Sequence, residues 1–204
     1  MPSLFNRVSN MCERLSTHMQ EPYDITMDRL SRTFDKDEFR SQLAALTIGS
    51  GSVATILCRS DLAPPGRNHR LTGGVMRCAP YANDLCTARY DRMNTDTALV
   101  LHGAHVIKQT WHAAQKALGW TAENIDVVVP HQVGKKVHRL GASYCGVDLN
   151  KLVATYPYTG NVGPASIGIA LSISEKNGRI KEGQRVVLAS FGSGINCIMA
   201  EVLW

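Results

Sequence analysis

The sequence predicts an α/β fold, because short β-branched runs alternate with longer stretches of helical periodicity over most of the chain. Seventeen glycines fall largely between these segments and disfavour a helical bundle. The chain has 204 residues and 44% of them are hydrophobic, which is enough to bury a core. One domain is the default at this length.

The first part of the chain, 1–43, is polar, Met-rich and charged, and we expect it to be a helical N-terminal segment. Within it, 13–17 and 36–43 have helical character. An aspartate, Asp35 or Asp37, is a start signal for the second of these helices.

The main domain, 44–204, begins with the sequence LTIGSGSVATILC, and the pattern predicts a strand over 46–58 that is interrupted at 49–51. Glycine inside a strand pattern indicates a bulge or the close approach of another backbone. The Pro-, Gly- and Asn-rich stretch 61–72 predicts a loop, and 73–79 predicts the second strand.

The segment 97–118 predicts a long helix, with Asp96 as a possible cap and Gly119 as a stop signal. The next segment, 125–129, is short and β-branched and predicts a buried strand. This strand ends at Pro130-His131-Gln132.

Four further segments complete the strand and helix pattern. A helix is expected from 134–140, a brief strand at 152–155, a buried strand at 185–190 and a last strand at 196–203. The sequence Phe-Gly-Ser-Gly at 191–194 predicts the tight loop between the last two strands. Together with the helix described next, the order from residue 46 is β-β-α-β-α-β-α-β-β.

An uncharged stretch, 156–174, predicts a buried central helix, because a surface helix would carry charge on its wet face. Pro164 suits the first turn of this helix, where its missing N–H has no consequence, and the helix is expected to stop near Asn177-Gly178. Asn161 would then lie at the electropositive N-terminal end, where an amide can donate to an oxygen that gains negative charge.

Composition narrows the class of protein. The formal charge is +5 and the pI is about 9.0, but the basic residues are scattered and only 6% of residues are aromatic, so nucleic-acid binding is not expected. Two explanations of the positive charge remain. It belongs to an ordinary solvated surface, or it attracts an acidic partner such as an acyl carrier protein or the phosphates of coenzyme A. No apolar run is long enough to span a membrane, no signal region precedes the domain, and the six cysteines form no C-x-x-C pair. We therefore expect a reduced cytoplasmic protein.

Three candidate residues follow a strand or open a helix, where ligands bind in open α/β sheets. His131 follows the 125–129 strand, Asn161 opens the central helix, and Ser193 lies in the loop after the 185–190 strand. A neutral imidazole and an amide side by side can stabilise an enolate or polarise a thioester carbonyl, and the Ser193 N–H can act as an oxyanion donor. By spacing alone, a structural histidine, a helix cap and an ordinary turn are the more common explanations of these residues.

Other kinds of site have weaker support. His102, His105 and His112 fall on the 97–118 helix, but no carboxylate or cysteine spacing completes a metal site, and we expect none. His138 lies seven residues after His131, yet Pro130 and an intervening glycine argue against one continuous helix face. The sequence also lacks a complete G-x-S-x-G motif and a phosphate loop.

Several motifs together resemble the C-terminal half of the thiolase-superfamily condensing enzymes, in the 3-oxoacyl-[acyl-carrier-protein] synthase III group. Within that group the sequence is most similar to the acyl-CoA condensing enzymes of long-chain olefin biosynthesis. The resemblance implies one thiolase-like half, with a mixed five-stranded sheet flanked by helices. The similar stretches, between about Phe39 and Trp204, are FRSQLAALTIGSGSVA, DRMNTDT, VVPHQV, GNVGPASIGIALS, GRIKEGQRVVL and FGSGINCIMAEVLW.

The resemblance implies roles for the three candidates. His131 and Asn161 match the catalytic histidine and asparagine of the family, and Ser193 matches its second oxyanion-hole donor. The family's nucleophilic cysteine and its glutamate base lie in the N-terminal half, and no motif in this chain matches them. Cys86 and Cys145 have the wrong sequence surroundings for that cysteine motif.

The expected function is therefore that of half an active site. A Cys-bearing N-terminal half, or a full-length relative, would complete an enzyme that condenses long-chain acyl-CoA into 3-oxoacyl thioesters. Acyl-CoA or acyl carrier protein would enter as substrate, and no cofactor is expected. The alternatives are a fragment of a decarboxylative synthase III and a non-catalytic partner subunit. In each case the chain is expected to expose an apolar face to its partner.

Overall fold

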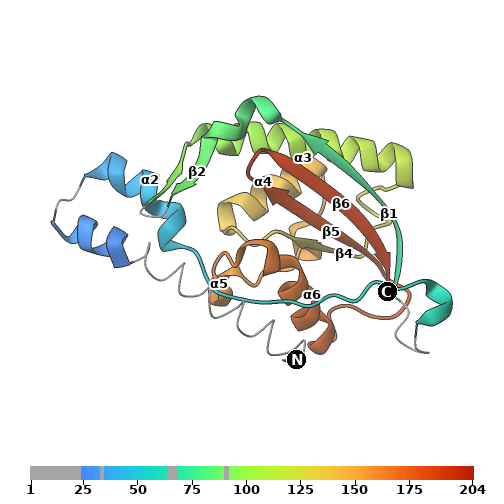
Figure 1. Ribbon diagram of the computed structural model, residues 1–204. Helices are drawn as coiled ribbons and strands as arrows, with labels where there is room; N and C mark the ends of the chain where they lie inside the picture. Colours follow the sequence, from blue (N-terminus) through green and yellow to red (C-terminus); the bar gives the residue numbers. More distant parts are fainter. Residues whose placement is uncertain (1–23, 33–34, 64–68, 90–91) are drawn as a thin grey trace.

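The protein has a mixed α/β architecture, as its sequence predicts (Figure 1). A central sheet has helices on both of its faces, in a three-layer arrangement. The expected helix at 13–17 falls outside the described residues. The computed structural model describes residues 24–32, 35–63, 69–89 and 92–204.

The central sheet has four strands in the order β1-β6-β5-β4. β4 and β5 are parallel, and the β5–β6 and β6–β1 pairs are antiparallel, so the sheet is mixed as expected. The expected five-stranded sheet is therefore one strand short among the described residues. The predicted brief strand at 152–155 is reduced to a single bridge between Leu152 and Val128, because a helix begins at Tyr156 and leaves too little extended chain. The strands are β1 (Arg70–Cys78), β4 (Val127–Pro130), β5 (Arg185–Gly192) and β6 (Asn196–Leu203).

Helices and one separate hairpin complete the fold. Residues 24–32 are also helical. The hairpin of β2 and β3 lies apart from the central sheet and was not predicted from the sequence. The remaining elements are α2 (Lys36–Leu46), β2 (Cys86–Arg89), β3 (Arg92–Thr95), α3 (Ala98–Leu118), α4 (Lys135–Cys145), α5 (Tyr156–Thr159) and α6 (Ser166–Lys176), with short 3₁₀ segments at Ser60–Leu62, Pro80–Leu85, Leu149–Lys151 and Gly163–Ala165.

Caps confirm the predicted start of α2 and, within one residue, both ends of α3, whereas α2 runs to Leu46 rather than ending at 43. At α3 the Asp96 carboxylate accepts the Ala98 N–H at 2.7 Å, and Gly119 ends the helix in the left-handed region with φ 66°. At α2 the cap is Asp35 rather than Asp37, because the Asp35 carboxylate accepts the Asp37 N–H at 2.7 Å.

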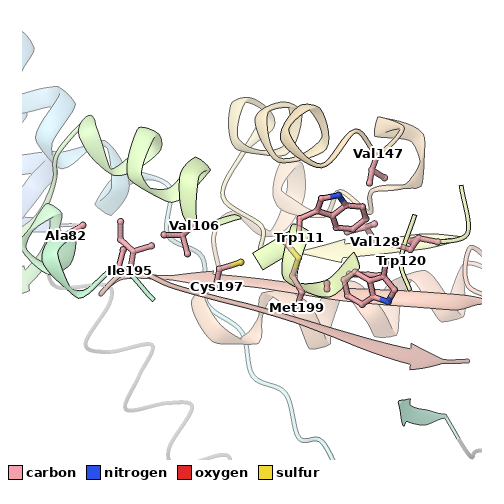
Figure 2. Close-up of a cluster of buried hydrophobic side chains, with 13 residues drawn as sticks. Ala82, Val106, Trp111, Trp120, Val128, Val147, Ile195, Cys197 and Met199 are labelled. Atoms are coloured by element: carbon pink, nitrogen blue, oxygen red, sulfur yellow. The ribbon is translucent and has the colours of Figure 1, made fainter. Parts of the chain in front are cut away.

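Two hydrophobic cores lie on opposite faces of the sheet. Along β4, Val128 points to the side of α3 and α4, whereas Val127 and Val129 point to α6. On the α3 side, Cys197 and Met199 of β6 and Ile195, just before that strand, lie beneath Val106 and Trp111 of α3 (Figure 2). The members of the smaller core on the α6 side are Val127, Val129, Val153, Ala170, Ile180 and Val186.

Two charged side chains that are buried or half-buried, those of Glu201 and Lys151, bond to groups from other segments of the fold. The Glu201 carboxylate on β6 accepts from Trp120 Nε1 and from the Thr72 hydroxyl, each at 2.6 Å, and lies 3.0 Å from Arg185 Nε. Where the chain passes from α3 into β4, the Lys151 ammonium donates to three carbonyl oxygens between 2.7 and 3.1 Å. These carbonyls belong to Ala122, Glu123 and Ile125.

The predicted strand at 46–58 is wrong. Leu46 ends α2, Ile48 makes one isolated bridge to Asn161, and 49–58 is an extended segment outside any sheet. The close backbone approach expected at these glycines is confirmed, because a Cβ on Gly49 would lie 2.0 Å from the Thr159 carbonyl oxygen. The segment has strand character but no described strand beside it to pair with.

The predicted central helix is broken into two pieces. α5 ends at Gly160, and α6 starts only at Ser166, after a 3₁₀ turn that carries Pro164 in its first positions. Gly160 has φ 65°, and a Cβ there would lie 2.8 Å from the Thr47 carbonyl oxygen, so this position requires glycine. The break leaves Asn161 just before the helix.

Candidate active site

His131 directly follows the last residue of β4, and its backbone N–H donates to the Ala189 carbonyl of β5 at 2.8 Å. Its side chain is half-buried and lines an apolar cavity of about 70 Å³. Burial lowers the pKa of His131, and the neighbouring His138 lowers it further. The imidazole is therefore held in its neutral form at pH 7, with one N–H available to donate.

The cavity lies between the sheet and helices α3 and α4, on the side of the larger core. Its lining is almost entirely apolar, with the His131 and His138 imidazoles as the main polar groups. Ser190 and Phe191, on the strand that leads to the Ser193 turn, also line it. An apolar group placed beside His131 would therefore be shielded from water.

Asn161 is held by the backbone on both sides. Its N–H donates to the Thr47 carbonyl at 2.9 Å, and its own carbonyl accepts the Gly49 N–H at 2.9 Å. The side-chain Oδ1 accepts the Gly163 N–H at 3.1 Å. This bond orients the carboxamide and leaves Nδ2 as the group that can donate to a substrate.

Ser193 lies in the turn between β5 and β6 and is exposed. The Asn196 side chain closes this turn by donating to the Ser193 carbonyl at 3.2 Å. Ser193 is thus in the tight loop that the sequence predicts.

Of the three predicted site residues, only His131 lines the cavity. Asn161 lies just after α5, and Ser193 lies just after β5. That these two residues act on the same substrate as His131 stays a prediction. Sequence reasoning missed Gln132, which is fully buried and bonds the His131 segment to the segment before α5. Its place in the Pro-His-Gln motif was the available signal.

His138 was considered in the sequence only as a possible neighbour of His131 on one helix. The structure places it on α4, while His131 precedes that helix, and both side chains line the cavity. His138 Nε2 donates to the Val153 carbonyl at 2.9 Å, and its ring lies 4.8 Å from that of Tyr156. Burial lowers the pKa of His138 as well.

The thiols near the cavity are poor nucleophiles. Burial raises the pKa of Cys145 to about 12 and that of Cys197 to about 11, so both stay protonated at neutral pH. Cys58 and Cys78 are exposed, and Cys12 lies outside the described residues. Within the described part of the chain, no group of three or more His, Cys, Asp or Glu side chains could hold a metal ion. No helix in those residues is long and apolar enough to cross a membrane.

Comparison with known families identifies the domain that carries all three candidate residues. Residues 115–204 match the C-terminal domain of 3-oxoacyl-[acyl-carrier-protein] synthase III. The match covers somewhat less than half of the 204 residues. The expected resemblance to the synthase III group is therefore confirmed.

Longer matches relate the chain to acyl-CoA enzymes. The chain is 41% identical over 184 residues to the acyl-CoA:acyl-CoA alkyltransferase of Xanthomonas campestris, covering 89% of this chain and 54% of that protein. The alkyltransferase of Shewanella oneidensis is 30% identical over 192 residues, which cover 89% of this chain and 55% of that protein. A beta-ketoacyl-[acyl-carrier-protein] synthase III of Sinorhizobium medicae is 39% identical over 93 residues, with 46% of this chain and 29% of that protein covered.

Solved structures agree with the thiolase-like fold. Xanthomonas campestris OleA with bound lauric acid and lauroyl-CoA superposes with a TM-score of 0.85 and 40% identity, covering 90% of this chain and 55% of OleA. The synthase III FabH of Xanthomonas oryzae gives a TM-score of 0.85 and 39% identity, over 91% of this chain and 55% of that protein. The chain thus spans about half the length of the alkyltransferases and solved synthases it resembles.

Proposed function

We propose that this chain supplies one half of the active site of an acyl-thioester condensing enzyme that joins long-chain acyl groups from acyl-CoA into 3-oxoacyl thioesters. The observation that carries the proposal is the position of His131, within the matched domain, in the wall of an apolar cavity. The nucleophilic cysteine comes from a second half, because the two described thiols at the cavity are held protonated.

The proposed reaction is a Claisen condensation. An acyl group is carried as a thioester on the cysteine of the second half. A second acyl thioester loses an α-proton to a base that also belongs to that half. Its α-carbon attacks the carbonyl of the cysteine-bound acyl group, a C–C bond forms, and the C–S bond to cysteine breaks with the electron pair leaving on sulfur.

His131 and Asn161 act on the oxygen of the second thioester. As the α-proton leaves, this oxygen gains negative charge, and the two side chains donate to it from the imidazole N–H and from Nδ2. The lowered pKa of His131 supports a neutral donor rather than a cation. The Ser193 N–H is assigned to the oxyanion that forms on the acyl group under attack.

Similarity to an acyl-CoA:acyl-CoA alkyltransferase supports acyl-CoA as donor. The chain is 41% identical over 184 residues to the Xanthomonas campestris alkyltransferase, and 31% identical over 183 residues to the synthase III of Pectobacterium atrosepticum. A decarboxylative reaction, in which the attacking carbanion forms by loss of CO₂ from a malonyl thioester, is the second candidate. The synthase III match over 115–204 supports it.

An open apolar surface supports the need for a second half. α6 packs mainly against β4 and β5, and among the described residues no other helix covers the same face of β1 and β6. The cross-strand partners Met76 and Ile198 are 54% and 44% exposed on this face. In the extended segment beyond α6, Ile56 and Leu57 are 90% and 80% exposed. Such a surface is typical of an interface.

The test is reconstitution. The chain is co-expressed with the Cys-bearing half of the Xanthomonas campestris alkyltransferase, and the purified complex is given lauroyl-CoA. Release of CoA and a 3-oxoacyl product, identified by mass spectrometry, support the proposal. Product that forms only when a malonyl thioester is added selects the decarboxylative reaction. A stable complex with neither activity indicates a non-catalytic subunit.

Two substitutions test the assigned roles. His131→Ala removes one donor, and Asn161→Asp keeps the oxygen that accepts the Gly163 N–H but removes Nδ2. Each is expected to lower kcat by about 100- to 1,000-fold, the usual effect of losing one oxyanion donor. His112→Ala, on the exposed side of α3, is the matched control and should leave kcat unchanged. Equal rates for His131→Ala and His112→Ala would remove the histidine from the mechanism.

A further inference from the structure

The Gln132 side chain is fully buried and uses its whole hydrogen-bonding capacity. Its Oε1 accepts the N–H groups of Thr155 and Tyr156 at 2.7 and 3.2 Å. Its Nε2 donates to the carbonyls of Pro130 and Val153 at 2.7 and 3.1 Å. The carboxamide therefore has two acceptor positions and two protons, all of them taken by backbone groups.

Three of these bonds join two separate pieces of backbone, and the fourth, to the Pro130 carbonyl, stays within the first of them. One is the end of β4, where Gln132 directly follows His131. The other is the segment 153–156, which has only the Leu152 bridge and one bond from the Val153 N–H to Val128 as sheet contacts. Gln132 thus takes the place of the ladder that a full fifth strand would supply.

The second piece of backbone leads directly to Asn161 through one short, bonded turn. The Thr159 N–H donates to the Thr155 carbonyl at 3.0 Å and the Gly160 N–H to the Tyr156 carbonyl at 3.1 Å. The Thr159 hydroxyl also donates to the Thr155 carbonyl at 3.0 Å. A displacement of Thr155 would therefore be passed on to Asn161.

We infer that Gln132 is a positioning residue that sets the separation between His131 and Asn161. The inference rests on the proposed function in one respect, that these two side chains act on the same substrate oxygen. Gln132 does not touch that oxygen, because its amide has no free donor or acceptor. A displacement of about 1 Å between two catalytic groups is enough to lower the rate strongly while substrate still binds.

Gln132→Met tests the inference, because Met has a similar length and makes none of the four bonds. In the reconstituted complex, kcat is expected to fall at least about tenfold while KM for acyl-CoA stays within about twofold. The matched control is Gln184→Met, since Gln184 Oε1 also accepts a backbone N–H, that of Lys181 at 2.7 Å, but in the turn before β5. A folded Gln132→Met complex with the kcat of the control would overturn the inference.

Gln132→Glu provides a second readout if the Met variant does not fold. A carboxylate can still accept from Thr155 and Tyr156 but faces the Pro130 and Val153 carbonyls without a proton to donate. Its protonated form regains one donor. The kcat of this variant, divided by that of the unsubstituted complex at each pH, should rise as the pH falls. The unsubstituted complex, measured in parallel, gives the contribution of His131 and His138 when residue 132 carries no charge. A ratio that does not change with pH contradicts the inference.

A structural readout separates this inference from the proposed function. Crystal structures of the full chain and of Gln132→Glu, without any second half, give the separation of the His131 and Asn161 side chains directly. A changed separation supports the positioning role even if no reconstituted complex condenses acyl-CoA. An unchanged separation overturns it, whatever the activity.

Discussion

Burial of the His131 imidazole lowers its pKa below the ordinary value of 6.5, and the second imidazole of the cavity, His138, is shifted in the same direction. Each histidine loses hydration without gaining a carboxylate partner among the interactions that shift its pKa. Both are therefore neutral in the folded protein at a pH where they are protonated in the unfolded chain.

This difference predicts how stability depends on pH. Just below pH 6.5 the unfolded chain binds protons that the folded chain does not, so the free energy of unfolding should rise with pH and level off above about 6.5. Urea unfolding at a series of values from about pH 5.5 to about pH 7.5 measures this slope. His131→Asn and His138→Asn should each reduce it, whereas His112→Asn on the exposed side of α3 should not. A slope unchanged by the first two substitutions would contradict the assignment.

At the level of single elements, two helical glycines differ in their surroundings. A Cβ on Gly103 in α3 would lie 2.6 Å from the Phe191 ring, whereas a Cβ on Gly141 in α4 would meet nothing within 4 Å. Gly103→Ala is expected to destabilise the fold by about 1–3 kcal/mol through overpacking. Gly141→Ala should stabilise it by up to about 1 kcal/mol, because alanine favours the helix. Chemical denaturation of both variants measures the two changes, and the same sign for both would contradict this account.

The elements that sequence patterns predicted well are those whose partners lie within the chain. β5 and β6 pair with each other across a tight turn, and α3 has a local start and stop at Asp96 and Gly119. The segment 46–58 has the same strand character, but strand formation needs a neighbouring strand, and none of the described strands lies beside it. The polar hairpin of β2 and β3 lacks apolar alternation and gave no pattern to detect.

The candidate site was predictable in part for a similar reason. His131, Asn161 and Ser193 follow strand ends and turns that local sequence defines. The contacts of Gln132 were not predictable, because they depend on Leu152 and Thr155 lying beside the end of β4, which is a property of the tertiary fold.

For the whole molecule, the open face of β1 and β6 predicts association. Met76→Lys combined with Ile198→Lys should weaken binding to the Cys-bearing half and reduce self-association of the chain alone. Its stability should change by only about 0.5 kcal/mol, since both side chains are already about half exposed. Analytical ultracentrifugation and co-purification measure the two effects. Leu101→Lys, at an exposed position on α3 across the sheet, is the control. Unchanged association in the double variant would place the interface elsewhere.

The three carbonyl contacts of Lys151 have a chemical consequence. An amine attacks an activated acyl group through its nitrogen lone pair, and this nitrogen directs all three of its protons to backbone oxygens. Lys135 and Lys136 at the start of α4 are exposed to solvent instead. In a protein proposed to bind reactive thioesters, the Lys151 amine, which holds the backbone just before β4, is thus shielded from accidental N-acylation. The Lys135 and Lys136 amines are not.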